Sequence, residues 1–482
     1  MHRGRLSKSE PYFDSGISLN AGDQHRRSFQ STPVCFKANG RENLFLNSMV
    51  QVTKLGLGPS SSHTESTARA TSTILGKIDS ILSIDKIVVE FIGSARMRMP
   101  NGTGEGHGVM WGAFYGLVKV INSHLSDADI QGVYHSWVDY KTSSRLTLGD
   151  VSFELIMRDA VGDDATQFSV GGSLRCYLNN TEEVFTRWNS VGSGITYIDA
   201  KKISTPSTRV ADVRSNLDNM LKSYTRCATP CSRSFNISGP SQWYPGNRHP
   251  FFNVKDGFRD LYHQDPTNLN ALIWWATLTG MDKNNQGART PIFPTKGSSG
   301  VASALWAISD HEGGSLSALI KYSDDYFKAY MEYASTAASK EGCMAETGPA
   351  AAGIAYALTL VRGGSLGNAF EAARLMHVMI KGLTCLPDDG AVRSPCTERD
   401  ALFSMVANMV VEKMVNKKEA RCSRVDWERE VMDCSSVGDA MPIVLKETND
   451  SNSFNDIFLG QPKGIVSNDS QNYRWNPINM AN

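Results

Sequence analysis

Hydrophobic and polar positions follow one pattern before about residue 200 and another after it. In the first part, Glu65 to Leu82 has helical spacing, Lys86 to Ile92 is a β-branched run, and Val151 to Met157 alternates like a half-buried strand. A mixture of helix and strand signals is typical of an α+β domain. We predict such a domain over residues 43–200.

After about Phe258 the strand signals fade and helical periodicity dominates. The segments with this periodicity are Asn268–Thr279, Val301–Ser309, Tyr326–Ser339, Ala350–Val361, Asn368–Lys381 and Asp400–Lys417. The fold class predicted for the chain is therefore α+β, with the α+β domain followed by an all-helical domain over residues 256–448.

A polar stretch rich in Ser, Arg, Asn and Pro, residues 201–255, separates the two patterns. We interpret it as a linker or a long irregular insertion and place the domain boundary there. Residues 1–42 are predicted to be a disordered extension and residues 449–482 a C-terminal tail. The acids Glu10, Asp14 and Asp23 argue against an organellar leader, although that alternative stays open.

Composition excludes several classes of protein. The 482 residues contain 49 Lys plus Arg and 49 Asp plus Glu, so bulk charge gives no reason to expect nucleic-acid or anionic-membrane partners. The longest apolar stretches, such as Ala350–Val361, are shorter than the roughly 20 residues of a membrane span. Nine cysteines are too sparse for a disulfide scaffold, which favours a reducing compartment and a cytoplasmic location.

The segment GLGPSSSHT, Gly56–Thr64, lies directly before a predicted helix. Its hydroxyls, its imidazole and the free N–H groups of a helix start would suit a carboxylate or a phosphate. The alternative is a Ser/Thr-rich cap on an ordinary helix, and the local pattern does not decide between the two.

A second candidate is the glycine-dense segment GTGEGHG, Gly102–Gly108, which contains His107. Its glycines alternate with other residues, and we recognise no βα unit around it, so a nucleotide-binding loop is not indicated. A histidine among glycines is accessible and can act as a general base near neutral pH. The alternative is a loop histidine without a role.

The third candidate is the set Cys343, Cys385 and Cys396, each near Gly or Pro at an expected helix end. Spacing alone is weak evidence, because scattered cysteines are more often small core residues. The pair Cys227 and Cys231 has metal-like spacing but no second ligand pair nearby, and we regard it as incidental.

Taken in order, these motifs resemble the bacterial-type iron–sulfur L-serine dehydratases over about residues 43–448, in a single-chain, divergent form. The resemblance is carried by GLGPSSSHT, GTGEGHG, SVGG at Ser169–Gly172, PTKGSSG at Pro294–Gly300, GCMAETG at Gly342–Gly348, and LTCLPDDGAVRSPCTERDA. It implies a [4Fe–4S] cluster on Cys343, Cys385 and Cys396, no pyridoxal phosphate, and an active site between the two domains.

The resemblance also implies roles for single residues. His107 is the candidate base, with His63 as a second catalytic residue. The residues implied to bind the amino-acid substrate are Ser60, Ser61, Ser62, Thr64, Thr295 and Lys296. The expected reaction converts L-serine to pyruvate and ammonia, and a homodimer is compatible with the resemblance. Rival hypotheses are a paralogue acting on another hydroxy amino acid or hydroxy acid, and a non-catalytic amino-acid sensor.

Several positions depart from the family pattern. No Cys follows Cys434, so the cluster iron that relatives cap is expected to be open. Glu105 replaces a common Lys, and Lys296 replaces the usual Asn. One hypothesis places the Lys296 ammonium in the substrate pocket, where it would favour a more acidic substrate. The alternative is that Lys296 faces solvent or pairs with Asp388 or Asp389.

Overall fold

The structure is a computed structural model that describes most of the region from residue 51 to residue 433. The described residues are 51–78, 83–93, 108–139, 145–148, 151–159, 170–178, 181–199, 201–225, 250–334, 336, 344–383, 396–415 and 422–433. The predicted extension (1–42) and tail (449–482) lie outside these ranges. None of the helices within them is long and apolar enough to cross a bilayer.

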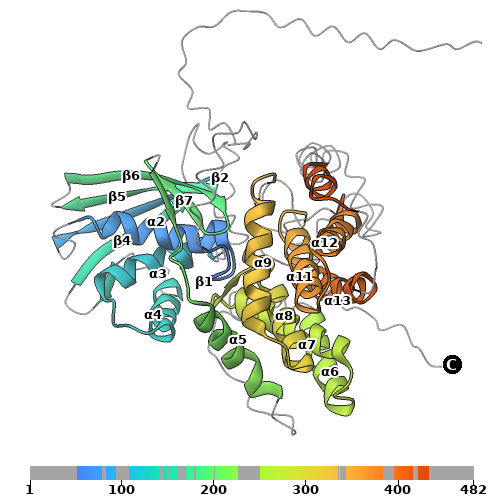
Figure 1. Ribbon diagram of the computed structural model, residues 1–482. Coiled ribbons are helices and arrows are strands. Elements are labelled where there is room, and N and C mark those ends of the chain that lie inside the picture. Colours follow the sequence, from blue (N-terminus) through green and yellow to red (C-terminus); the bar gives the residue numbers. More distant parts are fainter. Residues whose placement is uncertain are drawn as a thin grey trace, which may run out of the picture. The chain divides into compact units, whose positions relative to one another are not determined.

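The first part of the described chain is built around a mixed sheet (Figure 1). Its strand order is β3 (Arg145–Leu148), β4 (Val151–Asp159), β2 (Lys86–Gly93), β5 (Val170–Leu178), β6 (Thr181–Gly192), β7 (Ile195–Ile198) and β8 (Lys201–Ser204). Only the β2–β4 pair is parallel. The α+β prediction for this part is confirmed, and so are the predicted strands at β2 and β4.

Helix α2 covers the sheet, and further helices pack on α2. Helix α2 (Ser66–Leu75) packs on β5–β8, and α3 (Val109–Ile121) packs on α2 and on α4 (Asp127–Asp139). The predicted helix at Glu65–Leu82 is displaced. The helical segment starts earlier, with the short π-helical turn η1 (Ser61–Glu65), because the Ser60 side chain accepts a hydrogen bond from the His63 amide. It also ends earlier, since Gly76 caps the C-terminus of α2.

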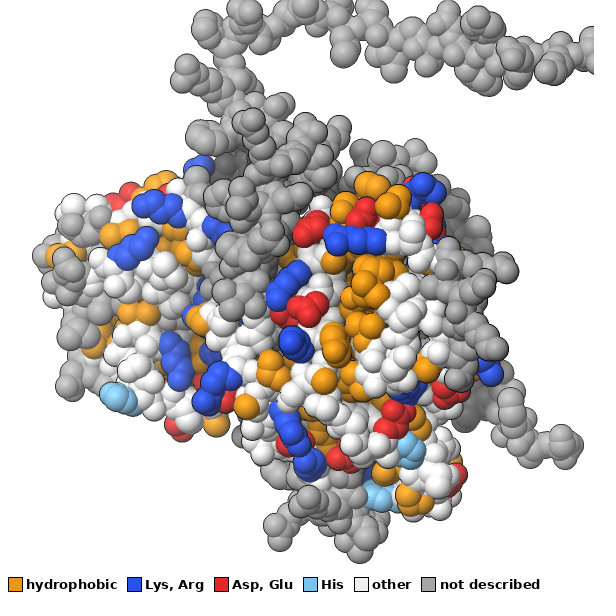
Figure 2. Space-filling model, viewed as in Figure 1, with side chains coloured by type: hydrophobic (Ala, Val, Ile, Leu, Met, Phe, Trp, Pro, Cys, Tyr) orange, Lys and Arg blue, Asp and Glu red, His pale blue; other side chains and the backbone are white. Residues whose placement is uncertain are grey.

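The second part is helical, as predicted. Its helices are α5 (Val210–Thr225), α6 (Pro250–Gln264), α7 (Leu269–Asn285), α8 (Ser299–Glu312), α9 (Leu316–Tyr330), α11 (Thr347–Val361), α12 (Leu366–Ile380) and α13 (Cys396–Met414), followed by a helical stretch at 424–433. Helix α8 is central and contacts α5, α7, α9, α11 and α13. On the face drawn in Figure 2, acidic and basic side chains are interspersed over this part.

Two features of the second part differ from the prediction. Residues 201–225, expected to belong to the polar linker, form β8 and α5, because Val213, Leu217 and Leu221 repeat every fourth residue and bury in the helical core. The helix expected at Tyr326–Ser339 is instead α9, which Ser315 caps at its N-terminus and which ends at Tyr330.

An unpredicted strand connects the two parts. Strand β9 (Arg289–Ile292) lies between α7 and α8 and pairs antiparallel with β1 (Lys54–Leu57), which directly precedes the GPSSSHT segment. Each strand has only four residues, too few for a clear alternation signal in the sequence. The pairing places the PTKGSSG segment, which follows β9, beside GLGPSSSHT.

Candidate functional site

The SSSHT segment divides into a half-buried set and a buried set. Ser60, Ser62 and His63 are half-buried, and His63 Nδ1 lies 3.2 Å from Ser60 Oγ and 3.0 Å from Ser62 Oγ. Ser61 and Thr64 are buried. The predicted binding residues at this segment are therefore together, with one imidazole and two hydroxyls on the more accessible side.

Two glycines at the start of α3 lie close to this segment. A Cβ at Gly108 would lie 2.6 Å from Thr64 Oγ1, and one at Gly112 would lie 2.3 Å from the Thr64 carbonyl oxygen. Gly108 also has φ of 68°, a left-handed conformation that favours glycine. His107 itself lies outside the described residues, but the residue that follows it packs directly on the SSSHT segment.

Glu65, the residue after SSSHT, is a buried carboxylate with donors from three elements. Its Oε2 accepts from the Leu57 amide at 2.7 Å, and its Oε1 accepts from Arg69 Nε and from Thr205 Oγ1, both at 3.0 Å. Glu65 therefore fixes β1 and the end of β8 to the start of α2. Glu65 was not among the residues predicted from the sequence motifs.

Lys296, in PTKGSSG, is fully buried. Its Nζ donates to the carbonyl oxygen of Gly56 at 2.9 Å and to both the carbonyl oxygen and Oγ1 of Thr290. Burial lowers the pKa of Lys296 well below its ordinary value, with nearby Glu65 opposing the shift. The expectation of a solvent-facing Lys296 is wrong, and the alternative partners Asp388 and Asp389 lie outside the described residues.

Asn284, at the end of α7, joins the two candidate loops. Its Nδ2 donates to the carbonyl oxygens of Pro59 and Lys296, both at 2.9 Å, and its Oδ1 accepts from Thr290 Oγ1 at 3.2 Å. The side chain is buried, and no sequence signal distinguished it from other asparagines. One amide thus connects GLGPSSSHT with PTKGSSG.

The PTKGSSG segment in turn contacts the residues after Cys343. Thr295 Oγ1 donates to Glu346 Oε1 at 2.9 Å, and Gly297 leaves room for that carboxylate, since a Cβ there would lie 2.2 Å from Glu346 Oε2. Thr295, a predicted substrate residue, is buried. The segment carrying the first candidate cysteine therefore adjoins the second candidate loop.

Hydrogen bonds connect residues that lie within four positions of the three candidate cysteines. The Gly382 amide, three residues before Cys385, donates to Met344 Sδ at 3.1 Å, and Met344 follows Cys343. Thr347 Oγ1 donates to Asp400 Oδ1 at 2.7 Å, and Asp400 lies in the first turns of α13, which Cys396 begins. Helices α11, α12 and α13 also pack on one another.

The cysteines themselves are not placed by the described residues. Cys343 and Cys385 lie outside them, as do Cys227, Cys231 and Glu105, and only the backbone of Cys396 lies within. Within the described ranges, no group of three or more His, Cys, Asp or Glu side chains could hold a metal ion. The cysteines described in full, Cys176 and Cys422, are buried, which raises their thiol pKa values to about 12 and about 11.

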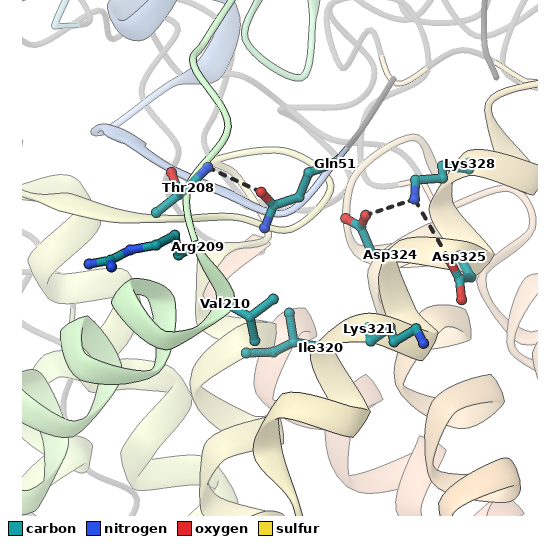
Figure 3. Close-up of a pocket in the computed structure, with 9 residues that line it drawn as sticks. All are labelled: Gln51, Thr208, Arg209, Val210, Ile320, Lys321, Asp324, Asp325 and Lys328. Carbon is teal, nitrogen blue, oxygen red and sulfur yellow. Dashed lines mark hydrogen bonds and ion pairs between the residues drawn. The ribbon is translucent and has the colours of Figure 1, made fainter. Parts of the chain in front are cut away.

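A separate hollow of about 370 Å³ lies between the start of α5 and α9 (Figure 3). It is lined by Gln51, Thr208, Arg209, Val210, Ile320, Lys321, Asp324, Asp325 and Lys328. Gln51 Oε1 accepts from the Thr208 amide at 3.1 Å, and Lys328 pairs with Asp324 and Asp325. None of the predicted site residues lines this hollow.

Comparison with known families places this geometry in context. Residues 48–201 match the family described as serine dehydratase beta chain, and residues 189–452, more than half of the chain, match serine dehydratase alpha chain. The chain belongs to the serine dehydratase family. This confirms the resemblance drawn from the motifs, and with it the expectation that the protein is an enzyme of this family.

Individual members of the family are distant relatives. L-serine dehydratase 1 of Escherichia coli (strain K12) is 24% identical over 83% of this chain and 97% of its own length. L-serine dehydratase of Streptomyces coelicolor shows the same identity and coverage. The alpha chain of Peptoniphilus asaccharolyticus L-serine dehydratase is 34% identical over 24% of this chain and 39% of its own. This serine dehydratase is thus a divergent member in single-chain form.

Proposed function

We propose that this chain is an L-serine dehydratase that converts L-serine to pyruvate and ammonia. Two relatives matched over 97% of their length carry that name. The observation that carries the proposal is the series of hydrogen bonds from Pro59 through Asn284 to Lys296, and from Thr295 to Glu346. It connects the SSSHT segment with the segment that follows Cys343.

We propose Cys343, Cys385 and Cys396 as ligands of a [4Fe–4S] cluster. The donor set fits, because thiolates are the usual ligands of such clusters and Cys396 begins a helix, where the helix dipole favours a thiolate. The Met344–Gly382 and Thr347–Asp400 contacts support convergence of the three positions. When bound, the cluster would supply a Lewis-acidic iron for the departing hydroxyl.

The remaining steps belong to the chain's own residues. The hydroxyls of Ser60 and Ser62 and the imidazole of His63 form a polar group suited to the substrate carboxylate, with Ser61, Thr64, Thr295 and Lys296 behind it. His107 is the proposed base that takes the α-proton. Loss of hydroxide from Cβ would leave an enamine, whose tautomer hydrolyses to pyruvate and ammonia. No pyridoxal phosphate enters this route. The cytoplasmic location and the homodimer stay predictions.

The cluster assignment can be tested by iron and sulfide content per chain after anaerobic purification. We expect Ala variants of Cys343, Cys385 and Cys396 to lose the cluster. The controls Cys176→Ala and Cys422→Ala should retain it, because those buried cysteines belong to none of the candidate motifs. Full cluster content in any of the first three variants would contradict the ligand set.

Pyruvate formation tests the activity. The anaerobic protein should release pyruvate and ammonia from L-serine in equal amounts. Turnover of another hydroxy amino acid or hydroxy acid in preference to L-serine would favour the paralogue. A cluster-free protein that binds amino acids without turnover would favour the sensor.

A further inference from the structure

Two lysines are buried beside the candidate loops, and they differ in one respect. Lys296 is 0% exposed, and its ammonium has three oxygen acceptors. Lys54, the first residue of β1, is 4% exposed. Within the described ranges, Lys54 Nζ makes neither a hydrogen bond nor an ion pair.

The strand geometry gives the direction of Lys54. Side chains two residues apart in a strand lie on the same face, so Lys54 lies on the face of Gly56. A Cβ on Gly56 would lie 3.4 Å from Glu65 Cδ. Lys54 therefore lies on the face of β1 that meets the end of the SSSHT segment.

The two carboxylates near Lys54 accept hydrogen bonds or form ion pairs with other residues. Asp324 Oδ1 accepts from the amides of Val52 and Thr53 at 2.7 and 2.5 Å, and its Oδ2 pairs with Lys328 at 3.3 Å (Figure 3). Glu65 accepts from Leu57, Arg69 and Thr205, as described above. Neither carboxylate forms an ion pair with Lys54.

Burial has the largest effect on the Lys54 ammonium, and nearby charges act on it in both directions. Burial lowers its pKa, nearby Lys202 and Arg69 act in the same direction, and Asp324 and Glu65 oppose them. A buried ammonium without a partner is unfavourable for folding. Groups that retain such an unfavourable environment are concentrated at ligand-binding and catalytic sites.

We propose that Lys54 binds the carboxylate of the small amino acid that occupies the SSSHT site. A carboxylate would supply the direct hydrogen-bonding anion that Asp324 and Glu65 do not, and β1 continues directly into the segment whose hydroxyls are proposed to bind the same group. The inference rests on the proposed function for the identity of the amino acid. This role differs from the one considered for Lys296, which was to favour a more acidic substrate.

The first arm of the test compares stability in the two lysine variants without ligand. Lys54→Met keeps the apolar stem and removes a charge that has no hydrogen-bonded partner among the described residues, so Tm should stay unchanged or rise. Lys296→Met leaves three buried oxygens without a donor, so Tm should fall by several degrees. A fall in Lys54→Met as large as that in Lys296→Met would overturn the proposal in favour of a structural lysine.

The second arm measures kinetics and ligand binding of the cluster-loaded chain. Lys54→Met should raise KM for L-serine by about tenfold or more and change kcat less, because a charged hydrogen bond to the bound substrate is lost. L-serinamide, which has no carboxylate, should bind equally well to both proteins. Lys54→Arg should recover part of the affinity for L-serine. An unchanged KM for L-serine in Lys54→Met would overturn the proposal.

Calorimetric titration with L-serine and with inorganic phosphate separates this inference from the proposed function. A chain that binds L-serine through Lys54 without dehydrating it would support the inference and contradict the activity. Dehydration of L-serine with unchanged affinity in Lys54→Met would support the activity and overturn the inference. Loss of phosphate binding alone in Lys54→Met would overturn the amino-acid ligand and indicate an inorganic anion site.

Discussion

Asn284 and Pro59 are 225 positions apart in the sequence, and a 2.9 Å hydrogen bond joins the Asn284 amide to the Pro59 carbonyl oxygen. The same amide nitrogen donates to the Lys296 carbonyl oxygen. Both of its protons are therefore used, one for each candidate loop. The relative position of the two loops depends on a side chain that belongs to neither motif.

Asn284→Asp should separate these loops. A carboxylate has the same shape but would face two carbonyl oxygens without a proton to donate, so we expect the free energy of unfolding to fall by about 1–3 kcal/mol. The kcat/KM for L-serine should fall as well. Asn216→Asp is the control, because Asn216 donates one bond to the Arg289 carbonyl oxygen and contacts neither loop. Urea denaturation measures the unfolding free energies, and steady-state kinetics measures kcat/KM. Equal losses of kcat/KM in both variants would contradict the prediction.

Glu65→Gln tests the carboxylate that holds β1 and β8 to α2. The amide nitrogen of Gln would face a donor at one of the two carboxylate positions, so we expect a loss of about 1–3 kcal/mol in unfolding free energy. Glu154→Gln is the control. Its carboxylate pairs with Lys86 at 3.4 Å on the sheet surface, where such pairs contribute about 0–1 kcal/mol. The two losses are compared by urea denaturation, and a larger loss in the surface variant would refute the role of Glu65.

Gly297→Ala should displace the Glu346 carboxylate, because the new Cβ would lie 2.2 Å from Glu346 Oε2. We expect destabilisation of about 1–3 kcal/mol and lower iron content, since Glu346 is three residues from Cys343. Gly257→Ala in α6 is the control. A Cβ there meets nothing within 4 Å, so this variant should gain about 0.5–1 kcal/mol. Normal iron content in Gly297→Ala would show that the two segments are not coupled.

His377 should make the fold sensitive to acid. Burial, with a smaller effect of Lys381, lowers the pKa of His377 from 6.5 to about 3, and its Nε2 lies 2.5 Å from Tyr326 Oη. Between these pH values the unfolded chain binds a proton that the folded chain does not, so stability should fall as pH falls from 6.5 toward 3. The slope from this group approaches about 1.4 kcal/mol per pH unit.

His377→Phe should therefore reduce the slope of unfolding free energy against pH in that window, although it removes a partner of Tyr326. The control is His124→Phe, which removes an exposed histidine. Chemical denaturation at a series of pH values measures both slopes. Equal slopes in the wild-type chain and in His377→Phe would rule out His377 as the acid-sensitive group.

Local patterns were sufficient for much of the fold. The β-branched run of β2, the alternation of β4 and the helical periodicity of α11 and α12 are properties of consecutive residues, so they can be read without knowing the neighbours. The order of the motifs likewise predicted the family that the matches to serine dehydratase alpha and beta chains establish. For α5 the same method failed, because its three core residues are diluted by polar ones.

The partners of each buried polar group were decided only by the tertiary structure. Lys296 lies in a motif segment and Lys54 lies two residues before one, and nothing in the sequence distinguishes a lysine with three acceptors from one with none in the described ranges. The difference arises because β1 pairs with β9, which brings the Gly56 carbonyl oxygen to Lys296 across 240 positions. A hydrogen bond depends on distance in space, and the chain between its two partners carries no signal of it.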